Sequence, residues 1–188
     1  MEKLSCAFTG HRPLKFPWRY DETDSRCVIL KSVLTEQIKA LAEAGVTEFL
    51  SGMAEGTDVW CAEIVLELRK DNPALKLHCV LPCEGQSDYW SAEAQKRYRD
   101  ILKQADQITY VNQKYTESCM LERNHWLVDH AGRLLAVYNG EYRGGTAATI
   151  RYAQKAKREI RVINPITFQI VRADENAETL DEQKSRAH

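Results

Sequence analysis

The sequence predicts an α/β protein with a doubly wound, mostly parallel sheet of about six strands and helices on both faces. Three observations predict this fold. Short apolar segments of strand character alternate strictly with longer amphipathic segments along the 188 residues. The polar, glycine-rich segments fall where a strand-like segment passes into a helix-like one. No repeat of fixed period interrupts this order. Strict alternation is typical of parallel sheets, because each crossover returns the chain to the same end of the sheet.

The first half of the chain supplies three of the strands and two of the helices. Apolar residues recur every three or four positions between residues 30 and 41, which is the spacing of one buried helix face. Asp24 or Ser25 is placed to cap the start of this helix, and Gly45 ends it in the manner of a left-handed cap. The elements expected here are strand 3–9, the helix that ends at 45, strand 46–51, helix 57–70 and strand 75–82.

The second half repeats the alternation and closes the domain. Its expected elements are helix 91–104, strand 106–111, helix 119–131, strand 133–138, helix 146–157 and strand 159–164. Pro165 ends the last strand. Residues 1–165 therefore form one expected domain, and residues 166–188 are expected to be a polar, frayed C-terminal tail.

Composition narrows the class of protein. With a formal net charge of −1, the chain lacks the overall excess of positive charge that is typical of nucleic-acid-binding proteins. No apolar run approaches the roughly 18 residues that a membrane span needs, and no secretory h-region opens the chain, so a cytoplasmic location is expected. The six cysteines form no CxxC pair and are interpreted as reduced core residues, with no metal and no cofactor expected. A metal site of Cys79, Cys83 and a histidine is the competing interpretation.

Two glycine-centred turns carry the functional prediction: SGMAEGTD at 51–58 and YNGEYRGGT at 138–146. A helix start carries unpaired backbone N–H groups and the positive end of the helix dipole. A glycine there lets an anion approach the backbone closely. The presence of two such turns indicates a single ligand that both turns contact, most simply a nucleotide or a phosphorylated sugar.

In the first turn the candidate ligand contacts are Ser51, Gly52, Glu55, Gly56, Thr57 and Asp58. The carboxylates oppose direct contact with phosphate, so this turn suits a sugar better. Glu55 or Asp58 would hydrogen-bond a ribose hydroxyl or act on it. The competing interpretation is a tight turn followed by an ordinary helix cap.

The second turn is the better phosphate candidate. Gly144 and Gly145 precede Thr146 at a helix start, and Arg143 adds a positive charge beside them. The competing interpretation of these residues is a glycine hinge followed by a threonine that caps the helix. The turn lacks the lysine spacing of a P-loop, which argues against an ATPase of that type.

Two further segments offer arginines. TGHRP follows the first strand, so Gly10 permits a close approach while His11 and Arg12 stand at the sheet edge. The guanidinium of Arg12 matches an anion in a bidentate fork. Arg123 shares a helix face with Leu127 and can lean toward the site while Leu127 packs. Solvated or salt-bridged arginines are the competing interpretations.

Together, FTGHRP, SGMAEGTDVWCAE, LPCEGQSDYW, ERNHWLVD and GGTAATIRYA resemble the YpsA-like family of bacterial proteins, over roughly residues 3–165. That family belongs to the SLOG superfamily, whose relatives include the LOG phosphoribohydrolases and the Rossmann-like domain of DprA. The resemblance implies a Rossmann-like sheet that binds nucleotides or nucleotide-derived ligands at these loops, and sensor or signalling roles. LOG-like relatives commonly pair, which leaves a homodimer open.

The resemblance also marks a departure. LOG hydrolases have an arginine upstream of a PGGxGTxxE loop. Arg123 could match that arginine, but here the loop reads NGEYRGGTAATI, with Thr149 or Ile150 where the motif has its glutamate. The first hypothesis is therefore a nucleotide-binding sensor without robust turnover. The second is an N-glycoside or phosphoribosyl hydrolase that uses Glu55 or Asp58. Single-stranded DNA binding of the DprA type is disfavoured by the near-neutral charge.

Overall fold

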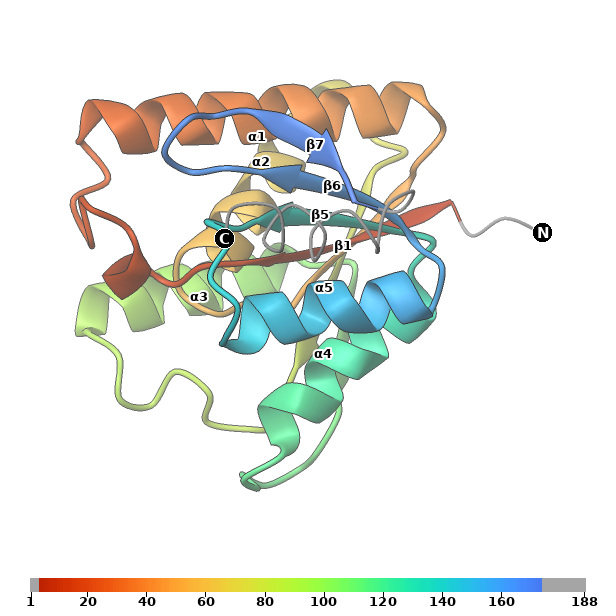
Figure 1. Cartoon of the computed structure of the whole chain (residues 1–188). Coiled ribbons are helices and arrows are strands. Elements are labelled where there is room, and N and C mark those ends of the chain that lie inside the picture. Colours follow the sequence, from red (N-terminus) through yellow and green to blue (C-terminus); the bar gives the residue numbers. More distant parts are fainter. Residues whose placement is uncertain (1–3, 174–188) are drawn as a thin grey trace.

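Seven strands form a single sheet in the computed structural model, which describes residues 4–173 (Figure 1). The strand order is β4-β3-β2-β1-β5-β6-β7, and every neighbouring pair is parallel except β6 with β7. The strands are β1 Ser5–Gly10, β2 Glu48–Ser51, β3 Lys76–Leu81, β4 Gln107–Tyr110, β5 Arg133–Val137, β6 Glu159–Ile163 and β7 Ile170–Arg172. The predicted doubly wound, mostly parallel α/β fold is confirmed.

The helices cover both faces, and the strand order explains which face each takes. The chain steps outward from β1 to β4, so right-handed crossovers put the three intervening helices on one face. It then returns to β5 beside β1, which puts the last two helices on the opposite face (Figure 1). The helices are α1 Ser25–Glu43, α2 Thr57–Asp71, α3 Ala92–Gln104, α4 Cys119–His130 and α5 Gly145–Lys155.

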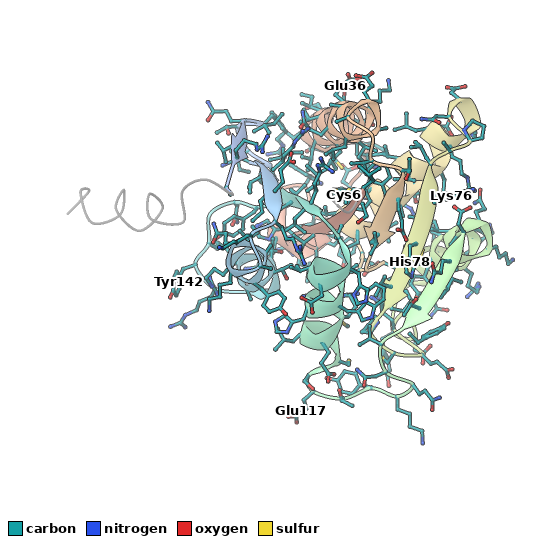
Figure 2. All side chains as sticks on the ribbon, turned by 90° about the vertical axis from the view of Figure 1, so that its right-hand side faces the viewer. Cys6, Glu36, Lys76, His78, Glu117 and Tyr142 are labelled. Carbon is teal, nitrogen blue, oxygen red and sulfur yellow. The ribbon has the colours of Figure 1, made fainter. Side chains whose placement is uncertain are left out.

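Each face has its own hydrophobic core. The core under α1, α2 and α3 is rich in aromatic rings, and Phe8 of β1 stacks on Phe49 of β2 with centroids 5.7 Å apart. The core under α4 and α5 is smaller and uses shorter side chains such as Ala7 and Ala136. All six cysteines are buried and free, as expected, and Figure 2 labels Cys6 in the interior.

Local signals in the sequence set several helix ends. The side chain of Asp24 accepts a hydrogen bond from the Arg26 N–H at the start of α1, and Gly45 follows its end with φ of +99°. Both agree with the predicted caps.

Two short elements were not predicted. A 3-10 turn, Pro13–Lys15, follows β1, and β7 returns antiparallel along β6 within the segment expected to be a polar tail. Strand β7 has three exposed residues, too few to show an alternating pattern. The rest of the expected tail, residues 174–188, lies outside the described residues.

The topology creates one crevice suited to a ligand. Strands β1 and β5 are neighbours, yet the chain leaves their carboxyl ends toward opposite faces of the sheet. Open α/β sheets bind ligands at such a switch point. Among residues 4–173, none of the helices combines the length and the apolar character that a membrane span requires. Within residues 4–173, no group of three histidine, cysteine or acidic side chains could hold a metal ion.

Candidate functional site

A cavity of about 250 Å³ opens at this switch point. Its walls come from the loops after β1, β2 and β5, from the first turns of α2 and α5 and from the second turn of α4. The residues that line it are Thr9, Gly10, His11, Arg12, Lys15, Ala54, Asp58, Arg123, Asn124, Glu141, Arg143, Gly144, Gly145 and Thr146. Segments far apart in the sequence therefore meet at one edge of the sheet.

The turn after β2 closes on itself and forms the floor. Ser51 Oγ donates to the backbone carbonyl of Asp58 at 2.8 Å and accepts from the Met53 N–H at 3.2 Å. The N–H and the hydroxyl of Thr57 both donate to the backbone carbonyl of His11, at 3.4 and 3.0 Å. These backbone N–H groups are thus occupied by the protein, so this turn is a scaffold more than an open anion cradle.

Two buried charges lie on this floor. Asp58 is 7% exposed; its Oδ2 accepts from the Ala54 N–H at 3.3 Å, and its buried Oδ1 has no hydrogen-bond partner within the described residues. Arg123 is 3% exposed and donates to the backbone carbonyl of Gly52 and to Asn124 Oδ1. Burial raises the pKa of Asp58, and the nearby positive charge of Arg123 opposes that shift. A carboxylate oxygen without a partner at a cavity wall is suited to a ligand hydroxyl or N–H.

His11 ties three loops together around the cavity. Its N–H donates to the backbone carbonyl of Val137 at 3.3 Å, and its own carbonyl holds the start of α2. Its ring Nε2 accepts from the backbone N–H of Asn139 at 3.0 Å, so Nε2 carries no proton there. Burial lowers the pKa of His11, which favours the neutral ring that this contact requires.

The turn after β5 forms an open rim. Gly144 precedes α5 with φ of +112°, and a Cβ added there or at Gly140 would meet nothing within 4 Å. No side chain caps the start of α5, whose first backbone hydrogen bond runs from the Ala148 N–H to the Gly144 carbonyl. The amides of residues 145–147 precede that bond, so they are available to an anion.

The charges around the cavity favour a negative ligand. The cationic side chains are Arg12, Lys15, Arg123 and Arg143, and the carboxylates are Asp58 and Glu141. Lys15 pairs with Glu141 at 2.7 Å across the mouth. This local excess of positive charge stands in a chain whose overall charge is −1, so it is a property of the site.

Eight predicted contacts line the cavity together: Gly10, Arg12, Asp58, Arg123, Arg143, Gly144, Gly145 and Thr146. The other five support it or lie elsewhere. Ser51 and Thr57 fasten the floor, as described above. A Cβ at Gly52 would stand 2.6 Å from Arg123 Nη1, and a Cβ at Gly56 would stand 2.9 Å from the His11 carbonyl. Glu55 lines a neighbouring hollow of about 470 Å³ instead.

Six lining residues were not among the predicted contacts: Thr9, His11, Lys15, Ala54, Asn124 and Glu141. Their signals in the sequence were weak. His11 belongs to the TGHRP segment, Glu141 to the second glycine turn, and Asn124 follows Arg123. Sequence neighbourhood could have suggested these three, but not the pairing of Lys15 with Glu141 across 126 positions.

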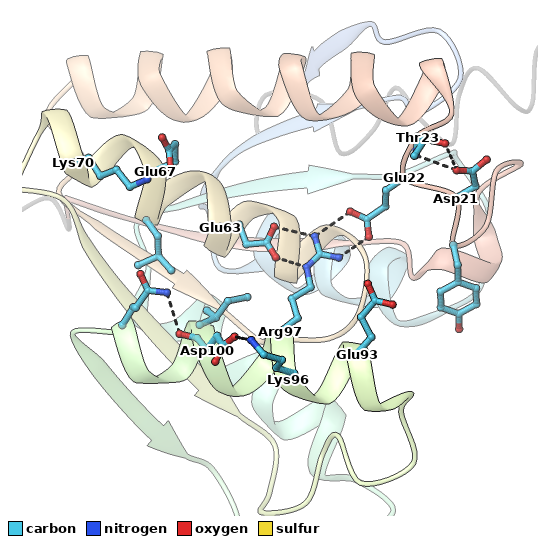
Figure 3. A pocket seen from close by; sticks show the side chains of 14 residues that line it. Asp21, Glu22, Thr23, Glu63, Glu67, Lys70, Glu93, Lys96, Arg97 and Asp100 are labelled. Atoms are coloured by element: carbon cyan, nitrogen blue, oxygen red, sulfur yellow. Dashed lines mark hydrogen bonds and ion pairs between the residues drawn. The ribbon is translucent and has the colours of Figure 1, made fainter.

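A larger hollow of about 830 Å³ lies between α2 and α3 (Figure 3). No predicted contact lines it. Its basic side chains are paired within the groove: Arg97 with Glu22 and Glu63, and Lys96 with Asp100 at 2.6 Å. We therefore place the candidate site at the switch point.

Comparison with known proteins agrees with the resemblance seen in the sequence. A model of the YspA SLOG family matches residues 6–171. A UPF0398 protein of Halalkalibacterium halodurans is 30% identical over 159 residues, covering 81% of this chain and 84% of the relative. One from Bacillus pumilus is 29% identical over 150 residues, covering 79% and 80%. One from Brevibacillus brevis is 35% identical over 130 residues, covering 68% and 69%.

A solved structure shares the fold. It is DNA processing protein A from Helicobacter pylori, which was studied for its single-stranded DNA binding mode. The TM-score is 0.60 at 18% sequence identity, over 98% of this chain and 74% of that one. At this identity the likeness supports the arrangement of strands and helices only.

Proposed function

Since the chain belongs to the YspA SLOG family, we propose that it binds a nucleotide or nucleotide-derived phosphorylated ligand and acts as a sensor or regulatory protein. The observation that carries this proposal is the open start of α5, which lines the cavity at the switch point together with Arg12, Arg123 and Arg143. Backbone amides at a helix start and guanidinium groups are both strong phosphate partners.

The start of α5 and the floor of the cavity would contact different parts of the ligand. The phosphate would lie on the amides of residues 145–147, where the helix dipole and Arg143 favour negative charge. Asp58 lies on the opposite floor with an unpaired oxygen and repels phosphate. A ribose hydroxyl can donate to that oxygen, so the sugar would occupy the floor side.

The absence of a carboxylate on α5 favours binding over turnover. At the position of the LOG glutamate, Thr149 is buried and donates to the Gly145 carbonyl at 2.8 Å, while Ile150 packs in the core. A second candidate function, nucleotide N-glycoside or phosphoribosyl hydrolysis, then depends on Asp58. Its buried, unpaired Oδ1 is the specific observation in its favour, since Glu55 belongs to the adjacent hollow.

Calorimetric titration with a panel of nucleoside monophosphates tests the proposal. We expect saturable binding, weakened about tenfold or more in Arg143→Ala, because a hydrogen bond to a charged group contributes about 1.5–3 kcal/mol. Arg99→Ala, an exposed arginine of α3 outside the cavity, is the matched control and should bind as the wild type does. Absence of saturable binding across the panel would contradict the proposal.

Two further readouts on the same samples separate the alternatives. Release of free base, followed by chromatography and abolished in Asp58→Asn, would indicate the hydrolase. Salt-sensitive retention of single-stranded DNA, with no nucleotide binding, would favour the DprA-type activity of the structural neighbour. Light scattering on eluted fractions would measure whether two copies pair.

A further inference from the structure

The hollow beside the cavity has the lining of a ring-binding site. It measures about 470 Å³ and lies between the β1–α1 loop, the turn after β2 and the start of α3. Its lining residues include Tyr20, Glu22, Glu55, Tyr89, Trp90 and Arg97. We infer that this hollow receives the base of the nucleotide whose phosphate lies at the start of α5. The inference rests on the proposed function and extends it to a second subsite.

The two sites are direct neighbours. Ala54 lines the cavity and the next residue, Glu55, lines the hollow, so one turn of backbone separates them. Arg12 lines the cavity, and its positive charge also acts on the carboxyl group of Glu55. A ligand held by phosphate on one side of this turn can therefore extend past Arg12 into the hollow.

Two of the three aromatic side chains here, Tyr20 and Tyr89, are exposed. Tyr89 is fully exposed and Tyr20 is 58% exposed, whereas Trp60 of the same face is buried in the core. Trp90 is half-buried and meets the Tyr98 ring edge to face, with centroids 5.2 Å apart, which holds its ring in place. Aromatic rings at a solvent-open hollow offer stacking surfaces to a nucleobase.

The charges of the hollow exclude a second phosphate. Arg97 is its one cationic lining residue within the described chain, and Figure 3 shows that residue bridging Glu22 and Glu63. Glu55 and Glu93 add negative charge. Burial raises the pKa of Glu55, and its carboxyl group can hydrogen-bond the polar edge of a base. The hollow thus suits a neutral ring with polar edges, such as a nucleobase.

Titration with AMP, GMP, CMP, UMP and ribose 5-phosphate tests the inference, using Tyr89→Ala as the main variant. Tyr89 is fully exposed, so its removal leaves the fold intact. We expect at least one nucleotide to bind about tenfold more tightly than ribose 5-phosphate, and Tyr89→Ala to remove most of that difference. Tyr89→Phe retains the ring and should retain the difference. Tyr115→Ala, an exposed tyrosine outside the hollow, is the matched control.

The outcomes separate this inference from the function on which it rests. If ribose 5-phosphate binds as tightly as every nucleotide, the base subsite is wrong and the phosphate site stands. The same conclusion follows if Tyr89→Ala leaves nucleotide affinity unchanged while Arg143→Ala weakens the binding of all ligands. If neither nucleotides nor ribose 5-phosphate bind, the proposed function and this inference both fall.

Discussion

The two glycine turns have similar sequences but differ in the structure, because other segments cover one turn and leave the other exposed. In the turn after β2, Thr57 donates its N–H and its hydroxyl to the carbonyl of His11, and Arg123 covers the carbonyl of Gly52. In the turn after β5, Gly140 and Gly144 have open space on the side where a Cβ would stand. One turn is a buried floor and the other is an exposed rim. A glycine-rich helix start is therefore a ligand cradle only where no other segment has already occupied its amides.

The difference has a functional consequence. The floor fixes the relative positions of β1, β2 and α4, and it carries a buried carboxylate and a buried guanidinium. Residues 140–145 of the rim are exposed. Substitutions in the floor should therefore be read mainly as losses of stability, and substitutions in the rim as losses of affinity.

The largest expected effect comes from Arg123→Met, which removes the buried guanidinium. It should lower the free energy of unfolding by about 3–5 kcal/mol, because Asp58 then loses its nearby opposite charge and Gly52 loses its donor. Arg143→Met on the exposed rim should change stability by less than about 0.5 kcal/mol. Urea denaturation measures both. An equal loss in the free energy of unfolding in the two variants would contradict the distinction between floor and rim.

A matched pair of glycine substitutions should give the next largest contrast. At Gly56, φ is +88° and a new Cβ would lie 2.9 Å from the His11 carbonyl, so Gly56→Ala combines backbone strain with overpacking. We expect a loss of about 2–4 kcal/mol. At Gly140, φ is +91° but nothing stands within 4 Å, so Gly140→Ala should cost only about 1–2 kcal/mol. Thermal or urea unfolding of the two variants checks the order, and a larger loss at Gly140 would contradict it.

A smaller effect follows from the raised pKa of Asp58, which is caused by burial. The folded state then binds the Asp58 proton more tightly than the unfolded state, so the ionised carboxylate destabilises the fold at neutral pH. The stability of the wild type should therefore rise relative to that of Asp58→Asn as the pH falls from the raised folded value toward the ordinary 3.8. Urea denaturation of both proteins across this pH range measures the difference between their free energies of unfolding. A difference that does not change with pH would contradict the prediction.

The order of elements was predictable because each strand and helix carries its own local pattern. The four-residue spacing from Leu30 to Leu34 and the cap at Asp24 needed no tertiary information. Strand β7 was missed, since its three exposed residues owe their strand geometry to pairing with β6.

The site was predictable only in part, for a related reason. Arg123 and Gly144 were found because helix faces and turn chemistry are local. Whether the first turn stays open depends on His11, 46 positions from Thr57, and on Arg123, 71 positions from Gly52. Such contacts leave no trace in local spacing. The sequence could therefore locate the edge of the sheet at which the candidate site lies, but could not tell which of its two glycine turns is occupied by other segments of the protein.

The smallest expected effect, and the one that tests the rim alone, is that of Glu141→Gln. Glu141 is exposed, and hydrogen bonds from Lys15 and Asn139 lower its pKa, so it is ionised at neutral pH. Its replacement removes one of the two negative charges that line the cavity and frees Lys15 to face the ligand. If the rim holds phosphate, nucleotide affinity should rise about two- to fivefold, with more gain at low salt. Glu36→Gln removes an equal charge from the outer side of α1 (Figure 2) and should leave affinity unchanged. A loss of affinity in Glu141→Gln would mean that the carboxylate itself contacts the ligand, and the rim would then have to be reassigned from phosphate to sugar.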